Sequence, residues 1–556
     1  MYKHAFDSVH LYMNEVGSRL VAKTGIPSDI YHIGKLIHQS LKDDPDFVSQ
    51  IDGATGQSET NGSVLERSVR CAIALTNMGL KKGDVMILMG PNHIDFCIPH
   101  NAALYLGIMV ACIDAALGIN ELKDLFHTND PKIIFCQSEK MTDVEKALKL
   151  SNVEPKIVTF DEGSNHTTFT QLLGNKNDEA VKDFQPTDFD PENTVAYLTS
   201  TSGSTGVPKT AILTHKNLAI SIPHVCTLHH YISVSRLGFF KFPSPTRLVL
   251  MMSPAQWLSA GLHYLFSTIM KYTRLQTSAP VTLEHFAELV NKYKVWIRIV
   301  WLPVTMVLPS TFVLPFVRPP ITTNVYLIAN DDLYLILQNL TKNDVFSLYG
   351  MSEVAGLGVH YDSALPGSCG RPLRINIIHM FQLVNNETKE DVTEPNLPGE
   401  LWLRGPTVFK GYYNNPEVTS DVLTEDGWLK TGDIFYRDPS WNMFFMERLK
   451  SLLKYRNHQV APGEVEAVIM KHPGVLHVAV TGIPDRECGD LVVACVVPRP
   501  GCSPTAQEIK DLVKESLTDS KQLRGGVIFM KEMPTTSTSK INRKKIKEMV
   551  LTMQRE

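Results

Sequence analysis

The sequence of 556 residues has few of the features that mark nucleic-acid-binding, secreted or metal-binding proteins. Its formal net charge is −4, so it lacks the excess of basic residues that neutralises a phosphate backbone. Its nine cysteines are scattered singly from Cys71 to Cys502, without the close pairs of metal sites or disulfide frameworks. These absences argue against a nucleic-acid partner and favour a reducing compartment.

Both ends of the sequence lack common targeting signals. The first twenty residues include acidic side chains and no continuous apolar run, so we expect no secretory signal. The last three residues, Gln-Arg-Glu, differ from the Ser-Lys-Leu peroxisomal address. We therefore expect an intracellular, cytoplasmic protein.

One uncharged apolar run, residues 299–317, is long enough to raise the question of a membrane span. Pro303, Pro309 and Pro315 interrupt it at regular intervals, and each would cost a helix about 3 kcal/mol or more. The run therefore favours buried strands and turns, and we expect no transmembrane segment.

The sequence does contain a regular alternation of apolar runs and amphipathic stretches, which is typical of α/β layers. Its length predicts about two to four packing units. The expected helices are 64–78 and 96–107, and the expected strands are 84–89, 157–160, 247–252 and 294–302.

The pattern changes near Asp433, where a charged stretch precedes a tail of strands and helices. The tail has expected strands at 475–481, 491–497 and 526–530 and a helix at 505–517. We place the boundary near Lys450. The sequence thus predicts a large multi-layer α/β domain over residues 1–448 and a small α+β domain over 449–556.

The most informative segment is residues 197–210, which reads Tyr-Leu-Thr-Ser-Thr-Ser-Gly-Ser-Thr-Gly-Val-Pro-Lys-Thr. Interleaved hydroxyl side chains and glycines let hydroxyls and backbone N–H groups converge on phosphate oxygens. A flexible linker would not run directly into the apolar strand at Ala211. A Walker loop needs Gly next to Lys, whereas Val207 and Pro208 separate Gly206 from Lys209. The segment favours a phosphate cradle of another kind.

This segment resembles the phosphate-binding signature of the adenylate-forming superfamily, which includes acyl-CoA synthetases, 4-coumarate-CoA ligases, peptide-synthetase adenylation domains and insect luciferases. Further blocks resemble that family in the same order, and the resemblance covers nearly the whole chain. The blocks are 348–353, 399–405, 411–417, 426–433, 447–455, 459–466 and 534–545. The resemblance implies a small C-terminal domain that moves as a lid.

The resemblance implies ATP, Mg²⁺ and CoA as cofactors. Tyr349 and Gly350 would flank the adenine, and Ser352 would lie near the α-phosphate. Asp433 and Arg448 would bind the ribose. The complete set of ATP contacts that it implies is Thr201, Ser202, Gly203, Ser204, Thr205, Gly206, Lys209, Tyr349, Gly350, Ser352, Asp433, Arg448 and Lys540.

Charged residues would carry out the chemistry. By resemblance Glu353 holds Mg²⁺, although a carboxylate at a helix start would also explain it. Lys540 would bridge the substrate carboxylate and the phosphate, and the alternative is a lysine in a basic surface patch. Lys450 would be the hinge of the lid, and Lys454 and Asn457 would approach the site for thioester formation.

The organic acid is the least defined substrate. The segments 257–262 and 354–358 are apolar or small and contain no acid that could pair with an amino group. Trp257, Ala355 and Gly356 are the candidate pocket residues, although small residues also permit tight packing. We expect a medium or long acyl chain.

Several positions depart from the family pattern. Thr210, Asn457 and Ser539 replace glycines, and Asn330, Asp331 and Asp332 occupy the usual adenine loop. Glu353, Asp433, Arg448 and Lys540 are all retained, so the resemblance still implies an ATP-dependent acid-CoA ligase. Two alternatives stay open: a luciferase-like monooxygenase, and a catalytically reduced paralogue that acts as a binding protein.

Overall fold

The computed structural model divides the chain into two compact units. One is formed mainly by residues 1–302, 308–380 and 403–429, and the other by 381–402 and 430–556. The residues described are 3–174, 178–201, 209–222, 248–251, 253–280, 282–293, 297–299, 325–327, 345–347, 349–359, 365, 368–371, 380–456, 458–535 and 541–556.

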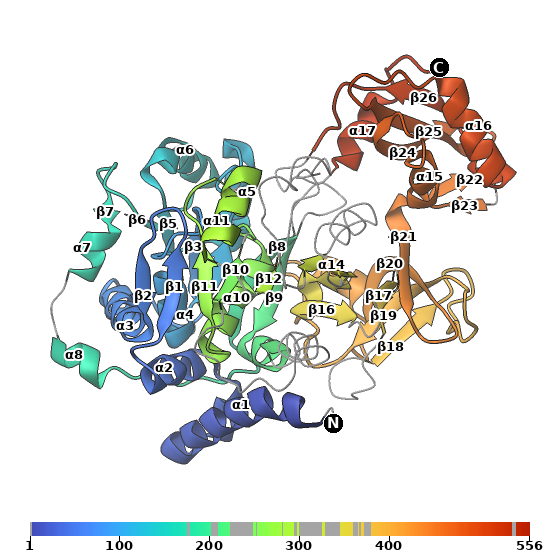
Figure 1. The fold of residues 1–556 in the computed structure, drawn as a ribbon. Coiled ribbons are helices and arrows are strands. Elements are labelled where there is room, and N and C mark those ends of the chain that lie inside the picture. Colours follow the sequence, from blue (N-terminus) through green and yellow to red (C-terminus); the bar gives the residue numbers. More distant parts are fainter. Residues whose placement is uncertain are drawn as a thin grey trace. The chain divides into compact units, whose positions relative to one another are not determined.

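The first unit contains a seven-stranded sheet with the strand order β7-β6-β5-β3-β4-β8-β9. All neighbouring strands are parallel except β8 and β9, which form an antiparallel hairpin. Figure 1 shows this sheet with helices on its faces. Its strands are β3 (Val85–Leu88), β4 (Met109–Cys112), β5 (Ile133–Cys136), β6 (Lys156–Thr159), β7 (Thr167–Thr168), β8 (Val195–Thr201) and β9 (Lys209–Thr214).

A second seven-stranded sheet has the order β14-β13-β12-β10-β11-β1-β2, parallel except for β1 and β2. Strands such as β3, β5 and β10 are apolar almost throughout, as expected where helices cover both faces of a sheet. The strands are β1 (Val48–Asp52), β2 (Ser58–Thr60), β10 (Leu248–Met251), β11 (Thr273–Gln276), β12 (Ile297–Ile299), β13 (Val325–Leu327) and β14 (Val345–Ser347).

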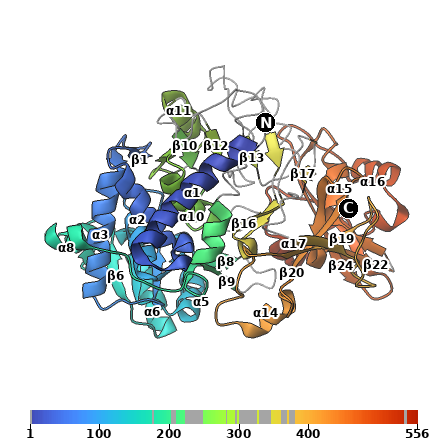
Figure 2. The ribbon, with the colours of Figure 1, turned by 90° about the horizontal axis from the view of Figure 1, so that it is seen from below.

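Helices connect the two sheets into layers. Helix α2 contacts both α4 and α10, α4 also contacts β4, and α10 contacts β11. Figure 2 shows α1 beside α2. The helices are α1 (Lys3–Thr24), α2 (Ile33–Asp43), α3 (Asn61–Asn77), α4 (Cys97–Leu106), α5 (Ile119–Asn129), α6 (Met141–Ser151), α7 (Phe169–Leu173), α8 (Asp178–Asp183), α10 (Leu258–Ile269), α11 (Leu283–Tyr293) and α14 (Pro416–Val422).

The second unit contains strands in the order β21-β20-β19-β18 and a separate C-terminal sheet. In the C-terminal sheet β24 and β25 form a long antiparallel hairpin, and β26 returns parallel to β25 after α16. The elements are β18 (Met380–Val384), β19 (Gly399–Arg404), β20 (Leu429–Arg437), β21 (Met443–Arg448), β22 (Leu453–Tyr455), β23 (His458–Val460), α15 (Pro462–Ile469), β24 (Val475–Asp485), β25 (Gly489–Pro498), α16 (Ala506–Ser516), β26 (Gly526–Phe529) and α17 (Arg543–Met549).

The C-terminal sheet has its own apolar core, so this region satisfies the basic condition for a separate folding unit. Val465, Ile469, Ile509 and Val513 from α15 and α16 are buried against the sheet. The helix α16 begins with a capping box in which Thr505 and Glu508 satisfy each other's backbone N–H groups.

The expected fold class is confirmed: layered α/β sheets precede a β-rich C-terminal region. The expected strands and helices are found within a few residues of their predicted limits. Of the run 299–317, only Ile299 lies among the described residues, in β12. In the described part of the chain, no helix has both the length and the apolar character needed to cross a membrane. The division at residues 448 and 449 falls between β21 and β22 and stays a prediction.

Candidate active site

The hairpin of β8 and β9 holds the two ends of the phosphate segment side by side. Thr201 at the end of β8 is the strand partner of Lys209 at the start of β9. The intervening residues Ser202, Gly203, Ser204, Thr205 and Gly206 lie outside the described residues. Antiparallel pairing therefore fixes the two ends of the segment, Thr201 and Lys209, beside each other.

Thr210, one of the replacements of a family glycine, follows Lys209 in β9. Its side chain is buried, and its hydroxyl has no hydrogen-bond partner among the described residues. Its carbonyl accepts a hydrogen bond of 2.8 Å from the N–H of Tyr413. The replacement is thus accommodated inside the strand, next to a segment from far along the chain.

That segment, residues 409–413, runs antiparallel to β9. The N–H of Ile212 donates to the carbonyl of Gly411 at 3.0 Å, and the N–H of Lys410 donates to the carbonyl of Ile212 at 3.2 Å. Ala211 and Tyr412 form an isolated bridge between the two segments. The chain around Tyr412 is therefore fixed beside the end of the phosphate segment.

The candidate metal ligand Glu353 lies in a short 3-10 turn (Ser352–Val354) and is buried. Its carboxylate oxygen Oε1 accepts a hydrogen bond of 2.8 Å from the Tyr412 hydroxyl, and its carbonyl accepts one of 2.8 Å from the N–H of Phe409. The ammonium of Lys209 lies 5.3 Å from the centroid of the Tyr412 ring. Lys209 and Glu353 thus both contact one aromatic residue.

The environment of Tyr412 stabilises its neutral, hydrogen-bond-donating form. Burial, together with the charge of the Glu353 carboxylate and the hydrogen bond to it, raises the pKa of Tyr412 well above the ordinary value for tyrosine. The hydroxyl is therefore protonated at every physiological pH, and it acts as a donor to Glu353.

The other candidate adenine and phosphate residues belong to the same hairpin as Glu353. Tyr349 and Gly350 lie in β15 (Tyr349–Met351), and β16 (Gly356–Val359) pairs with it in antiparallel fashion. Ser352 begins the connecting turn. Ala355 ends it with a positive φ of 52° and is fully buried. Packing alone explains this burial, so the substrate roles of Ala355 and Gly356 stay predictions.

Trp257 lies at the start of α10, where its N–H donates to the carbonyl of Pro254 at 2.9 Å. The side-chain amide of Asn92 donates a hydrogen bond of 2.7 Å to the nearby carbonyl of Ser253. Trp257 is half-buried. Its position is fixed by these local contacts, and its place in a substrate pocket stays a prediction.

The two candidate ribose ligands lie in the second unit, where they are strand partners. Asp433 in β20 pairs with Arg448 in β21, and the guanidinium Nε lies 3.3 Å from the carboxylate oxygen Oδ1. The Asp433 side chain is 5% exposed, whereas that of Arg448 is 60% exposed. The pair therefore presents a fixed acid beside a solvent-facing cation.

The candidate lysines of the C-terminal region lie on its surface. Lys450 is exposed in a 3-10 turn (Leu449–Ser451), and Lys454 is exposed in β22, where its N–H donates to Asp490 at 2.9 Å. Lys540 lies outside the described residues. So do Asn457, Ser539 and the adenine-loop residues Asn330, Asp331 and Asp332.

Comparison with known families gives two matches along the chain. The AMP-binding enzyme family matches residues 37–307 and 329–413, and the AMP-binding enzyme C-terminal domain matches residues 464–540. The chain belongs to the AMP-binding enzyme family. The family matches cover the phosphate segment, the hairpin of Glu353 and residue Tyr412, and the structure brings Lys209, Glu353 and Tyr412 together.

Known proteins similar to this AMP-binding enzyme have more than one activity. A luciferin 4-monooxygenase of Photuris pensylvanica is 30% identical over 87% of this chain and 88% of its own. A 4-coumarate-CoA ligase of Narcissus pseudonarcissus is 29% identical over 92% of both chains. The fold matches ATP-bound MatB of Rhodopseudomonas palustris with a TM-score of 0.77 and 20% identity, over 93% of this chain and 98% of that one.

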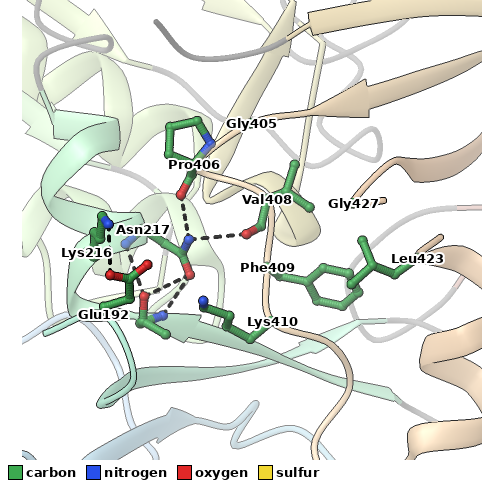
Figure 3. Close-up of a pocket in the computed structure, with 11 residues that line it drawn as sticks. Glu192, Lys216, Asn217, Gly405, Pro406, Val408, Phe409, Lys410, Leu423 and Gly427 are labelled. Atoms are coloured by element: carbon green, nitrogen blue, oxygen red, sulfur yellow. Dashed lines mark hydrogen bonds and ion pairs between the residues drawn. The ribbon is translucent and has the colours of Figure 1, made fainter. Parts of the chain in front are cut away.

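The AMP-binding enzyme has a further feature that the sequence did not predict, a pocket of about 220 Å³ in the first unit. Figure 3 shows Asn217 among the residues that line it. The amide nitrogen of Asn217 donates to the carbonyls of Pro406 and Val408 at 2.7 and 3.2 Å. The pocket is lined by Glu192, Thr214, Lys216, Asn217, Gly405, Pro406, Val408, Phe409, Lys410, Leu423 and Gly427.

Residues that line this pocket fix the backbone next to the candidate active site. Lys216 forms an ion pair of 3.0 Å with Glu192. Asn217 donates a hydrogen bond to the carbonyl of Val408. The N–H of the following residue, Phe409, donates to the carbonyl of Glu353. An asparagine in a polar stretch gives no sequence signal for this role, because the bonded carbonyls lie 189 and 191 residues away.

The residues present fit a magnesium ion that arrives with its nucleotide. Mg²⁺ in nucleotide sites is usually held by one or two carboxylates together with phosphate oxygens and water. Among the residues that the structure describes, no group of three or more acidic, histidine or cysteine side chains could form a metal cage of its own. Glu353 is a single buried carboxylate. It therefore fits a magnesium ion that is held by one carboxylate together with phosphate oxygens and water.

Proposed function

We propose that this AMP-binding enzyme is an ATP-dependent acid-CoA ligase, which activates a carboxylic acid as acyl-AMP and transfers the acyl group to CoA. The observation that supports this most is the cluster of Lys209, Tyr412 and Glu353. It sets one cation and one carboxylate beside the end of a segment rich in phosphate-binding groups. Both charges are needed where a triphosphate and its metal must be held in line with an attacking carboxylate.

In the first half-reaction, a carboxylate oxygen attacks the α-phosphorus of ATP and pyrophosphate leaves. Glu353 would hold Mg²⁺, which neutralises phosphate charge when bound. Lys209 and the hydroxyl side chains of the phosphate segment would bind the phosphates, and Lys540 would bridge the carboxylate and the α-phosphate. Asp433 and Arg448 would bind the ribose hydroxyls.

In the second half-reaction, the thiol sulfur of CoA attacks the acyl carbonyl and AMP leaves. One fixed arrangement of residues does not suit both steps, so we propose that the C-terminal region rotates about Lys450. Exposure of both Lys450 and Lys454 is compatible with this role. The rotation would remove Lys540 from the site and bring Lys454 towards it.

We propose a medium or long acyl chain as the acid. The candidate pocket segments near Trp257 and Ala355 contain no acidic side chain that could pair with the ammonium of an amino acid. A buried unpaired charge costs several kcal/mol, so such a substrate would bind poorly.

Two other functions have specific support. The Photuris relative is a luciferin 4-monooxygenase, which favours an oxidisable acid as an alternative substrate. The replaced glycines and the acidic residues 331 and 332 favour a protein that binds nucleotide but has lost part of its catalysis. All three functions share the ATP site, and they differ in the chemical steps after ATP binding.

Exchange of labelled pyrophosphate into ATP, measured with a panel of acids, separates these functions. We expect exchange that requires Mg²⁺ and an apolar acid, and release of acyl-CoA when CoA is added. Preference for an amino acid would contradict the proposed substrate, and light from luciferyl adenylate would support the luciferase alternative. ATP binding without exchange for any acid would support the reduced paralogue.

The variant Lys540→Ala tests the assignment of the adenylation step. We expect exchange to fall by about 10² to 10³ while ATP binding stays nearly constant, because the lysine acts on transition-state charge. A suitable control is Lys544→Ala, four residues along the same basic stretch. Equal exchange by Lys540→Ala and the unmodified protein would remove Lys540 from this role.

A further inference from the structure

Tyr412 contacts two charged residues of the candidate ATP site, Glu353 and Lys209, although no family block gave it a role. Its hydroxyl donates to Oε1 of Glu353 at 2.8 Å, and its ring lies 5.3 Å from the Lys209 ammonium. Tyr412 and Glu353 are 9% and 8% exposed. A hydrogen bond to a carboxylate so far from solvent is stronger than the same bond in water.

The surroundings of Tyr412 restrict the orientation of its ring. Its N–H donates to the hydroxyl of Thr419 at 2.9 Å, and its backbone is bridged to Ala211 in β9. The ring of Phe409 meets it edge to face, with centroids 5.0 Å apart and an interplanar angle of 76°. These contacts therefore fix the position from which the Tyr412 hydroxyl donates to Glu353.

The backbone of Val408 and Phe409 also helps to position Glu353. The N–H of Phe409 donates a hydrogen bond to the carbonyl of Glu353. The carbonyl of Val408, the preceding residue, accepts a hydrogen bond from the side-chain amide of Asn217. Both the backbone and the side chain of Glu353 are thus fixed from the segment 408–412. A carboxylate held in this way needs little reorganisation when a metal ion binds.

We propose that Tyr412 is a positioning residue, which orients the Glu353 carboxylate towards the metal of MgATP and keeps the Lys209 ammonium near the phosphates. This inference rests on the proposed ATP site, and it adds a residue that acts through Glu353 and Lys209 without contacting the substrate itself. The hydroxyl and the ring have separate tasks, so variants can separate them.

The test uses the full chain with Tyr412→Phe, which removes only the hydroxyl, and Tyr412→Leu, which also removes the ring. The matched control is Tyr413→Phe, because Tyr413 is only partly buried and its hydroxyl makes no hydrogen bond among the described residues. Circular dichroism and thermal unfolding establish that each variant is folded before any comparison.

The first readout is the Mg²⁺ concentration that gives half-maximal pyrophosphate exchange. Loss of a residue that orients a metal ligand typically weakens metal affinity or activity about 10- to 100-fold, so we expect a shift of about tenfold or more for Tyr412→Phe. Tyr412→Leu should also raise the KM for ATP, because it removes the contact with Lys209. An unchanged Mg²⁺ requirement in folded Tyr412→Phe, or an equal shift in Tyr413→Phe, would overturn the inference.

The second readout does not depend on catalysis. Binding of the α,β-methylene analogue of ATP, measured by calorimetry at graded Mg²⁺, should need about tenfold more Mg²⁺ in Tyr412→Phe. This readout holds even if the unmodified protein shows no exchange, so failure of the proposed ligase activity is distinguishable from failure of this inference. Binding that is independent of Mg²⁺ in the unmodified protein would contradict the role of Tyr412.

Discussion

Two buried acids, Glu353 in the first unit and Asp433 in the second, are held in different ways. Glu353 accepts a hydrogen bond from the neutral hydroxyl of Tyr412, which lies 59 residues further along the chain. Asp433 forms an ion pair with Arg448, its partner on the adjacent strand of the same hairpin. One acid is thus positioned by tertiary packing and the other by the register of a hairpin.

The difference suggests how each acid would work with its ligand. The Tyr412 hydroxyl is a neutral donor, so its hydrogen bond leaves the negative charge of Glu353 in place, which suits a metal ligand. A carboxylate beside an exposed guanidinium is partly neutralised, and it can still accept hydrogen bonds from hydroxyl groups, which suits a ribose. The comparison therefore predicts different kinetic effects when each acid is replaced by its amide.

The largest effect is expected for Glu353→Gln, which keeps the size of the side chain and removes its charge. Exchange should fall by about 10² to 10³, because stabilisation of transition-state charge is lost. Excess Mg²⁺ should restore part of the rate. The control Glu417→Gln alters an exposed acid of α14 and should leave exchange unchanged. A fall of less than about threefold in Glu353→Gln would remove Glu353 from the metal site.

A smaller effect of another kind is expected for Asp433→Asn. The KM for ATP should rise about tenfold or more, because a hydrogen bond to a charged group contributes about 1.5–3 kcal/mol. The kcat for exchange should change little, since ribose binding is the same in the ground and transition states. If kcat falls while KM stays constant, the acid acts in the chemical step and the contrast with Glu353 fails.

The smallest effect on activity is expected for Asn217→Ala, which removes support for the segment 408–412. The free energy of unfolding should fall by about 1–3 kcal/mol, because the buried carbonyl of Val408 and the partly buried carbonyl of Pro406 lose their donor. Chemical denaturation measures this loss. The control Asn193→Ala removes an exposed asparagine and should change stability by no more than about 0.5 kcal/mol.

The same contrast explains what could be predicted from the sequence. The apolar runs predicted strands such as β3 and β10 because strands covered by helices on both faces are apolar throughout. The hydroxyl-rich segment before Lys209 indicated phosphate binding from residue chemistry alone. Asp433 and Arg448 were assigned together by resemblance, and the register of β20 and β21 pairs them.

Other parts of the site could not be predicted from the sequence. Tyr412 lies inside a block that resembles the family, but its hydrogen bond to Glu353 arises only when residues 409–413 pack along β9. The role of Asn217 is equally hidden, because its partners are carbonyl groups, which every residue has. The burial of Ala355 is likewise a property of packing, since small residues suit a pocket and a tight turn equally well.

The position of the metal in a structure with Mg²⁺ and the α,β-methylene analogue of ATP tests the central claim most directly. The account predicts Mg²⁺ at about 2.1 Å from a carboxylate oxygen of Glu353, with the Tyr412 hydroxyl still bonded to that carboxylate. Lys209 should contact a phosphate oxygen in the same structure. A metal bound to the phosphates and another carboxylate, with Glu353 remote from both, would contradict the account.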